Sequence, residues 1–226
     1  MNARSQILVT GGSGALGSAV VAALCARDYS VIANYWHDEK RAQTLSDVTG
    51  CALYRADIRD ENAVQTLFDS HRFDAVIHAA GANRDALLLR TSAELWREQM
   101  RWLDAAFLLT RASLRTLPEG ARLILIASRV GERGTVGQSA YAASKGAILG
   151  LMRTAAKERD DLRINAICPG FAPSALSQNI SEKTGKKRAE ENSLPDADAA
   201  QSLAAACLWL LNANVSGQIV RPDCRV

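Results

Sequence analysis

The chain reads Thr10-Gly11-Gly12-Ser13-Gly14-Ala15-Leu16-Gly17 directly after a short apolar run, Gln6–Thr10, and before an amphipathic stretch, Ala15–Arg27. Read from Gly12, the pattern is G-x-G-x-x-G. Glycines permit a tight turn, let the backbone approach a pyrophosphate and let a helix pack closely on a strand. The free N–H groups at the start of the helix then face the phosphates. The segment predicts a strand, a phosphate loop and a helix; the alternative is a glycine-rich turn without a ligand.

The same alternation of short apolar runs and longer amphipathic stretches continues along the chain. Runs such as Leu123–Ile126 are apolar on both faces, as parallel strands covered by helices are. We predict strands at 6–10, 30–35, 52–55, 75–79, 122–127, 163–168 and 218–220. We predict helices at 15–27, 39–47, 61–70, 93–117, 139–160 and 197–211. This order indicates an α/β fold: a Rossmann-like, doubly wound parallel sheet with helices on both faces.

Length and composition favour one ordinary globular domain over residues 1–226, because alternating α/β folds often exceed 200 residues without dividing. With 48% hydrophobic and 23% charged residues, the chain is not disordered, collagenous or a disulfide-built miniprotein. The net charge of +3 does not argue for a nucleic-acid or membrane partner. No apolar stretch reaches the roughly 18 residues of a membrane helix, and no secretory signal is evident.

The cysteines and histidines argue against a disulfide framework and against a metal site. The five cysteines are scattered, odd in number and without a CxxC pair. They are typical of reduced, buried thiols, so a cytoplasmic location is expected. The three histidines have no metal-ligand spacing with the cysteines.

The end of the second predicted strand bears on the choice of nicotinamide cofactor. An acid there would bind a ribose 2′-hydroxyl and favour NAD. The strand ends Asn34-Tyr35-Trp36 instead, and the nearest acid, Asp38, is interpreted as the N-cap of the following helix. A 2′-phosphate is then tolerated, and His37, Lys40 or Arg41 could help to neutralise it. The sequence favours NADPH over NADH.

A candidate catalytic group follows the fifth predicted strand. Ser128 lies just past that strand, and Tyr141 and Lys145 lie four residues apart on a predicted helix. That spacing puts both on one face, about 6 Å apart along the axis. A neighbouring ammonium lowers the phenol pKa from about 10, which suits a general acid that protonates a developing alkoxide. A serine hydroxyl can hydrogen-bond the same oxygen. Each residue alone is common; the combination with the glycine loop carries the information.

Together these motifs resemble the short-chain dehydrogenase/reductase family. Thr10–Gly17 resembles its T-G-x-x-x-[AG]-x-G, and Ser128 followed by Tyr141-Ala142-Ala143-Ser144-Lys145 matches its serine and Y-x-x-x-K. Asp57-Ile58 matches the acidic pair beside the adenine, and Asn165 with Pro169-Gly170 matches the following strand and turn. His78-Ala79-Ala80-Gly81 is similar to its N-N-A-G segment, with only Ala80 and Gly81 kept.

The resemblance implies roles for particular residues. The catalytic residues would be Ser128, Tyr141 and Lys145. The cofactor-binding residues would be Gly11, Ser13, Gly14, Ala15, Leu16, Gly17, Asn34, Asp57, Ile58, Ala80, Gly81, Tyr141, Lys145, Pro169 and Gly170.

A closer resemblance is to bacterial 3-oxoacyl-acyl-carrier-protein reductases. Gly81–Leu88 resembles their G-x-x-R-D-x-L-L stretch, and Gly137–Tyr141 and Pro169-Gly170-Phe171 also look like that subgroup. This implies reduction of a β-ketoacyl thioester, acyl-carrier-protein-linked, by NADPH. It also implies a homo-oligomer, a tetramer or a dimer, that pairs the long helices at 93–117 and 139–160.

Three departures from the family stand out. Trp102 occupies the place of an asparagine that passes protons to the lysine through water. Ser174 stands where a threonine usually contacts the carboxamide, and Arg221–Val226 replaces the usual D-G-G close. These changes suit a specialised paralogue, one acting on carrier-bound polyketide or polyene chains.

One stretch, residues 172–195, is rich in Ser, Lys, Glu and Asn. It follows a predicted strand end, where ligands of open α/β sheets bind. It is interpreted either as a lid over the substrate or as a solvated surface loop. Its basic run, Lys183–Arg188, could meet an acidic carrier protein, although charged loops usually face solvent.

Two other functions stay open on the sequence alone. One is a cofactor-binding partner subunit with little activity of its own, which Trp102 supports. The other is an alcohol or sugar dehydrogenase that runs oxidatively with NAD. Nucleic-acid binding is remote, because no basic stripe with interleaved aromatic residues is present.

Overall fold

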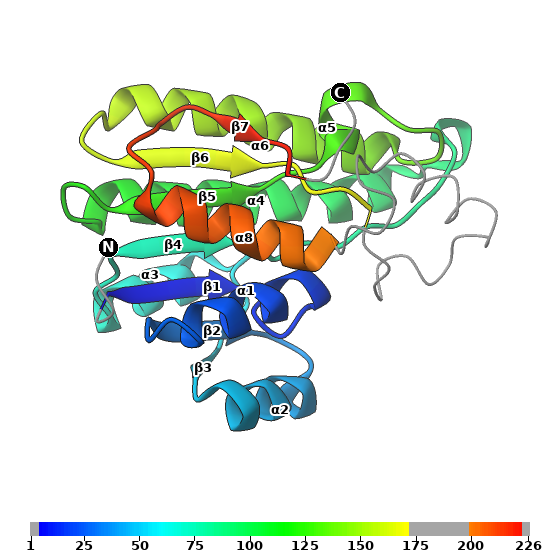
Figure 1. Ribbon diagram of the computed structural model, residues 1–226. Coiled ribbons are helices and arrows are strands. Elements are labelled where there is room, and N and C mark those ends of the chain that lie inside the picture. The colour runs from blue at the N-terminus through cyan, green and yellow to red at the C-terminus, as the bar shows by residue number, and fades with distance from the viewer. Residues whose placement is uncertain (1–4, 172–198, 223–226) are drawn as a thin grey trace.

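A seven-stranded parallel sheet runs through the protein, in a computed structural model that describes residues 5–171 and 199–222 (Figure 1). The strand order is β3-β2-β1-β4-β5-β6-β7, so the chain leaves from the centre toward one edge and then toward the other. The strands are β1 Gln6–Thr10, β2 Ser30–Tyr35, β3 Ala52–Arg55, β4 Ala75–His78, β5 Arg122–Ile126, β6 Arg163–Ile167 and β7 Ile219–Val220. The predicted Rossmann-like α/β fold is confirmed.

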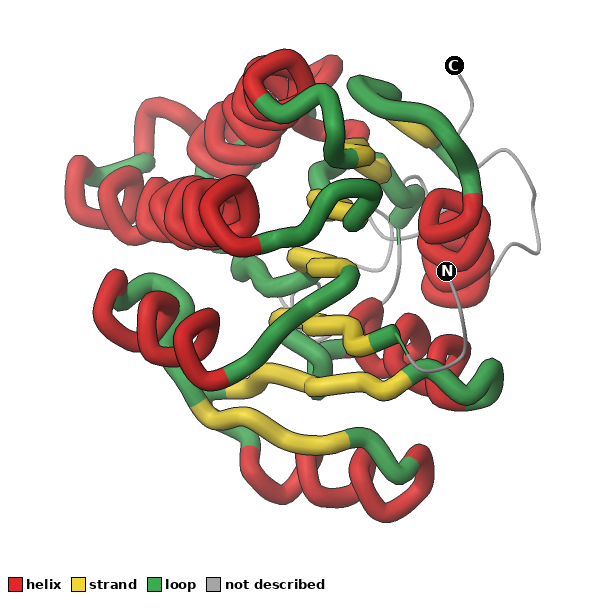
Figure 2. Tube along the Cα trace, turned by 90° about the vertical axis from the view of Figure 1, so that its left-hand side faces the viewer, coloured by secondary structure: helices red, strands yellow, loops and turns green. Residues whose placement is uncertain are grey.

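Helices cover both faces of this sheet, as Figure 2 shows. On one face lie α1 (Ala15–Cys25), α2 (Glu39–Thr49) and α8 (Ala199–Asn212); on the other lie α3 (Glu61–Ser70), α4 (Ala93–Thr116) and α6 (Ser139–Glu158). Two short helices, the 3-10 helix η1 (Leu88–Arg90) and α5 (Arg129–Arg133), follow β4 and β5. Neither was predicted.

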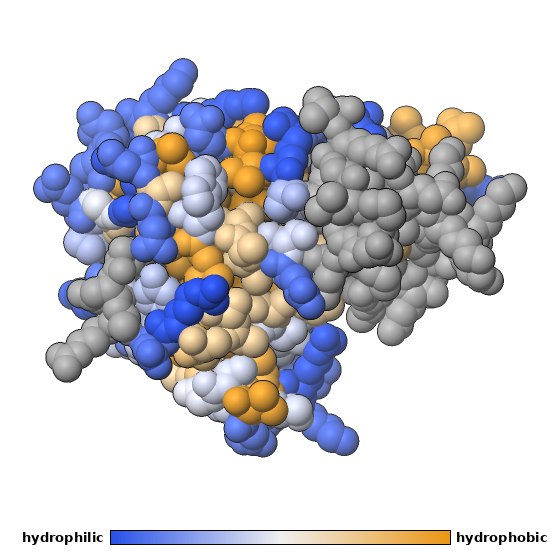
Figure 3. Space-filling view, in the orientation of Figure 1, coloured by the Kyte–Doolittle hydropathy of each residue, from blue (hydrophilic) through white to orange (hydrophobic). Residues whose placement is uncertain are grey.

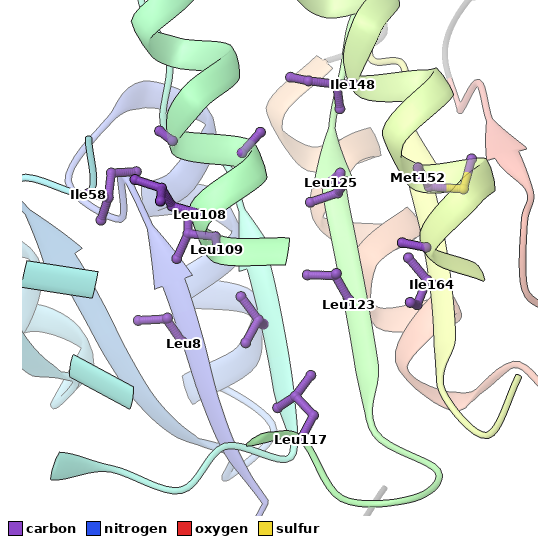
Figure 4. Close-up of a cluster of buried hydrophobic side chains, with 14 of the residues drawn as sticks. Leu8, Ile58, Leu108, Leu109, Leu117, Leu123, Leu125, Ile148, Met152 and Ile164 are labelled. Atoms are coloured by element: carbon purple, nitrogen blue, oxygen red, sulfur yellow. The ribbon is translucent and has the colours of Figure 1, made fainter. Parts of the chain in front are cut away.

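The core lies in two layers because successive side chains of a strand point to opposite faces. Leu8 belongs to the core layer that also contains residues of α4 and α6 (Figure 4), whereas its neighbours Ile7 and Val9 belong to the layer with α1 and α8 on the other face. All three are fully buried, and each contributes about 1.5–3 kcal/mol. Strands that are apolar on both faces can therefore bury all their side chains only between two layers of helices.

Several predicted element ends were wrong by one or two residues. The first helix ends at Cys25 rather than at residue 27, because the chain turns over Ala26 and Asp28 adopts a left-handed backbone (φ 60°). The second runs two residues longer than predicted, to a left-handed Gly50 cap. The strands β4, β5 and β6 each end one residue earlier than predicted, β7 begins one residue later, and the helices α4 and α6 end at Thr116 and Glu158.

Some predicted features lie outside the described residues. These are the segment 172–195 with Ser174 and Lys183–Arg188, and the end of the chain from residue 223. Within the described residues, no helix combines the length and apolar character needed to cross a membrane.

Candidate active site

The phosphate loop between β1 and α1 has the shape that its glycines predict. Gly11 has φ +64°, and a Cβ there would lie 2.7 Å from the Cα of Ala80. A Cβ on Gly17 would lie 2.2 Å from the carbonyl oxygen of Gly11, so the first turn of α1 packs directly on the loop. No side chain caps the start of α1 at Gly14. The first N–H groups of the helix are therefore available to an anion, as a pyrophosphate requires.

This loop forms one end of a cavity of about 420 Å³ at the carboxyl ends of the strands, a size typical of small-molecule sites. The cavity is where a ligand of an open α/β sheet is expected. It brings together all the residues to which the family resemblance gives a catalytic or cofactor-binding role: Gly11, Ser13, Gly14, Ala15, Leu16, Gly17, Asn34, Asp57, Ile58, Ala80, Gly81, Ser128, Tyr141, Lys145, Pro169 and Gly170.

Lys145 reaches the cavity from the first half of α6 and is buried along its length. Its Nζ donates to the carbonyl oxygen of Ile126, 2.7 Å away, at the end of β5. Burial lowers the pKa of Lys145 to about 8, against a smaller opposing effect of the Cys168 thiol. The ammonium lies 5.9 Å from the centre of the Tyr141 ring, so the predicted pair does share a face. This positive charge favours the phenolate form of Tyr141.

Ser128 lies one residue beyond Ala127, where β5 turns into α5. It is the N-cap of that short helix, and its Oγ accepts from the backbone N–H of Val130 at 3.2 Å. That bond fixes the hydroxyl at the mouth of the cavity and still lets it donate its own proton to a ligand oxygen. The serine therefore combines a capping role with a place in the site.

The start of α2 borders the other end of the cavity. Asp38 is the N-cap of α2, as predicted, and its carboxylate accepts from the backbone N–H of Arg41 at 2.9 Å. His37, Asp38 and Arg41 line the cavity, whereas Lys40 does not. Asn34 also lines it, but its side-chain amide donates to the carbonyl oxygen of Ala56 (3.0 Å) and so braces β2 against the chain beyond β3.

Asp57 forms a bidentate ion pair with Arg59, with both N···O distances 2.8 Å. The hydrogen bonds from Arg59 hold the pKa of Asp57 below its usual value. The Arg59 guanidinium also lies 5.0 Å from the centre of the Trp102 ring. Trp102, which stands in the place of the family asparagine, therefore lines the cavity against this ion pair.

Several side chains around the site were not singled out from the sequence. Asp85 accepts from the side-chain amides of Asn83 (2.6 Å) and Gln138 (2.7 Å), which joins the loop after β4 to the start of α6. His78 lies at the end of β4, and Gln99 bridges α4 and α6. Apart from the Asn83–Asp85 contact, these contacts join residues 45 to 68 positions apart, and no local spacing signals them. In the described ranges, no cluster of histidine, cysteine and acidic side chains could hold a metal ion.

The chain is similar to a family model described as Enoyl-(Acyl carrier protein) reductase, which matches residues 12–224. It is 33% identical over 227 residues to a 3-oxoacyl-acyl-carrier-protein reductase of Bos taurus, covering 95% of this chain and 94% of that protein. It is also 33% identical over 189 residues to the protein of that name from Rattus norvegicus (79% and 80%). An acetoacetyl-CoA reductase of Rhizobium meliloti is 32% identical over 192 residues (80% and 79%).

Solved structures agree with the fold. A dehydrogenase/reductase from Sinorhizobium meliloti 1021 superposes with a TM-score of 0.89 at 24% identity, over 98% of this chain and 94% of that one. The protein BdcA, solved in complex with NADPH, gives a TM-score of 0.88 at 23% identity, over 97% and 94%. At these identities the likeness establishes the architecture alone.

Proposed function

This chain belongs to the short-chain dehydrogenase/reductase family, and we propose that it is an NADPH-dependent ketoreductase that reduces a β-ketoacyl thioester, carrier-protein-bound, to the β-hydroxyacyl form. One observation carries the proposal. Ser128, Tyr141 and Lys145 converge on the cavity that the phosphate loop also lines. The hydrogen-bond donor Ser128, the proton donor Tyr141 and the buried ammonium of Lys145 thus lie beside the proposed dinucleotide site.

The residues of the loop fit a nicotinamide dinucleotide, because glycine at 11 and 17 keeps the tight turn, where a Cβ would clash with Ala80 or with the Gly11 carbonyl oxygen, and so lets the backbone approach a pyrophosphate. When bound, this cofactor supplies a hydride to the carbonyl carbon. Tyr141 gives its phenolic proton to the carbonyl oxygen, and Ser128 donates a hydrogen bond to the same oxygen. Lys145 favours the phenolate that Tyr141 leaves, because its ammonium lies on the same face of α6.

The charges near α2 support NADPH rather than NADH. Asp38 also lines the cavity, but its carboxylate accepts from the backbone N–H of Arg41 as a helix cap, and the cationic side chain of Arg41 and the imidazole of His37 lie at the cavity beside it. A guanidinium suits a 2′-phosphate, which accepts bidentate, charge-assisted hydrogen bonds. A bare 2′-hydroxyl would need an acceptor there instead.

The thioester class is supported by the names of the relatives and by an apolar rim near the start of α6, outside the residues that line the cavity. The segment after β4 exposes Leu87, Leu88 and Leu89, and Figure 3 shows apolar surface at this right-hand edge of the molecule. The backbone N–H of Ala86 donates to the carbonyl oxygen of Gly137 at 2.8 Å, so this apolar rim sits beside the start of α6. An acyl chain is a suitable occupant of such a surface.

Two further features belong to the proposal. The resemblance implies a homotetramer or a dimer formed through α4 and α6, and the scattered cysteines suit the cytoplasm. Sedimentation of the purified protein would give the oligomeric state directly.

The test follows the loss of NADPH absorbance with an acetoacetyl thioester, beside NADH and beside a crotonyl thioester. Tyr141→Phe should abolish turnover, whereas Tyr29→Phe, at the opposite core layer, should not. Full turnover by Tyr141→Phe would overturn the assignment of Tyr141 as the general acid.

The alternative functions give other results. NADPH consumption with the crotonyl thioester alone would favour the enoyl reduction in the family model's description. NADH preference with an alcohol would favour a dehydrogenase, and cofactor binding without turnover would favour a partner subunit.

A further inference from the structure

Gln99 is a buried amide on the face of α4 that packs against α6. It is 4% exposed, and α4 otherwise buries mainly alanine and leucine around it. A side-chain amide without hydrogen bonds would be costly to bury there. Its contacts therefore show what the residue does in this helix.

Both hydrogens of the Gln99 amide are used, and each goes to a different segment. Nε2 donates to the carbonyl oxygen of Ala82 at 3.0 Å, in the loop after β4, and to Ser144 Oγ at 3.3 Å, on α6. The Ser144 hydroxyl in turn donates to the backbone carbonyl oxygen of Tyr141 at 2.9 Å. One side chain of α4 thus connects the loop after β4 to the backbone of Tyr141.

The two segments held by Gln99 are those that flank the Lys145 amine. Ser144 precedes Lys145 in α6, and Ala82 follows Gly81, where a Cβ would lie 3.5 Å from Lys145 Nζ. The amine itself is fixed from the third side by the carbonyl oxygen of Ile126. A shift of α6 relative to the loop would therefore change the place of both Tyr141 and Lys145 in the cavity.

We propose that Gln99 is a positioning residue of the ketoreductase reaction: through Ser144 and Ala82 it sets the place of Tyr141 and Lys145. The proposal rests on the proposed function of the site. Trp102, three residues further along α4, contacts the Arg59 guanidinium instead. The polar link from α4 to the catalytic face of α6 is thus made by Gln99 rather than from the position of the family asparagine.

The experiment measures kcat and KM with NADPH and an acetoacetyl thioester for Gln99→Met, Ser144→Ala and the double variant. Misplacement of reacting groups lowers turnover steeply, so each single variant should lose roughly tenfold or more in kcat. KM for NADPH should change less than kcat, because the phosphate loop is untouched and only the contacts of Tyr141 and Lys145 with the cofactor would shift. The double variant should be no worse than the worse single one, since both break one chain of contacts.

Thr110→Val is the matched control, because Thr110 is also buried on α4 and its hydroxyl has no partner among the described residues. Gln99→Met and Ser144→Ala with kcat within twofold of this control would overturn the proposal, as would losses that multiply in the double variant. If Gln99→Met does not fold, Ser144→Ala decides, because it removes the same link at a smaller side chain.

Amide hydrogen exchange of residues 139–146 separates this inference from the proposed function. It should be faster in Gln99→Met than in Thr110→Val. If the wild-type protein turns over no thioester, the proposed function fails. Amide hydrogen exchange alone then tests whether Gln99 holds the start of α6 in place. Unchanged exchange would then overturn it.

Discussion

The imidazole Nδ1 of His78 lies 2.8 Å from the hydroxyl oxygen of Thr10, across the neighbouring ends of β4 and β1. Thr10 Oγ1 also accepts a long bond (3.5 Å) from the backbone N–H of Ala80. Which of the two atoms supplies the shared proton depends on the imidazole tautomer. This pair joins the start of the phosphate loop to the segment after β4, in which Gly81 lies beside the Lys145 amine.

Replacing His78 with asparagine should make the protein less sensitive to acid. Burial, with a smaller effect of Lys145, lowers the pKa of His78 to about 3, whereas the unfolded chain takes up this proton near pH 6.5. Between these values the unfolded state binds more protons, so stability falls as the pH falls below about 6.5. Urea unfolding at pH 7.5, 6 and 4.5 should show a smaller loss for His78→Asn than for the wild-type protein. His71→Asn, which changes a surface-accessible imidazole on the C-cap of α3, is the control. Equal losses in His78→Asn and wild type would contradict the buried neutral imidazole.

Lys145 should also make the free energy of unfolding depend on pH, but in the alkaline range. Its folded pKa of about 8 lies below the unfolded value of about 10.4. Between these values the unfolded chain holds a proton that the folded chain has lost, so the free energy of unfolding rises with pH. Relative to Lys145→Met, the wild-type protein without cofactor should gain roughly 3 kcal/mol from pH 7 to pH 10.5. Chemical denaturation of both proteins across that range gives the difference. Parallel curves would show that the amine is not desolvated as its burial indicates.

The sequence predicts this architecture well because its signals are local. The glycines at 11–17, the four-residue spacing of Tyr141 and Lys145, and strands apolar on both faces each act within a few residues of the chain. The Asp38 cap is local in the same sense, since its acceptor reaches a backbone N–H three residues on. Such features can be read without knowing which elements become neighbours.

What could not be predicted depends on pairs far apart in the chain. The helix α5 has five residues, too few for a periodic pattern. This helix packs closely on α6 because residue 131 is glycine. A Cβ on Gly131 would lie 2.6 Å from the backbone nitrogen of Gly146 in α6. Gln99 looks like an ordinary polar residue of an amphipathic helix until Ser144 is known to face it. The contact of Trp102 with Arg59 likewise joins two segments that only the fold brings together.

Two glycine-to-alanine substitutions should have opposite effects. Gly17→Ala places a methyl group 2.2 Å from the Gly11 carbonyl oxygen, so the loop must move. We expect a loss of about 1–3 kcal/mol in the free energy of unfolding and a loss of nicotinamide cofactor binding. Gly150→Ala, in the middle of α6, meets no atom within 4 Å and should gain about 0.5–1 kcal/mol from helix propensity. Thermal unfolding and a cofactor fluorescence titration measure both. Unimpaired binding by Gly17→Ala would show that the loop tolerates a side chain.

Arg41 and Lys40 provide a matched pair for the choice of cofactor. They are adjacent cations in the first turn of α2, but only Arg41 lines the cavity. A charge-assisted hydrogen bond to a 2′-phosphate contributes about 1.5–3 kcal/mol, so Arg41→Gln should raise KM for NADPH by about tenfold or more. KM for NADH should hardly change, because NADH lacks that phosphate. Lys40→Gln removes the same charge from the same turn and should leave both constants near wild type. Equal effects of the two substitutions on NADPH would mean that net charge near α2, rather than a contact from Arg41, attracts the cofactor. Equal effects of Arg41→Gln on NADPH and NADH would mean that Arg41 does not read the 2′ position at all.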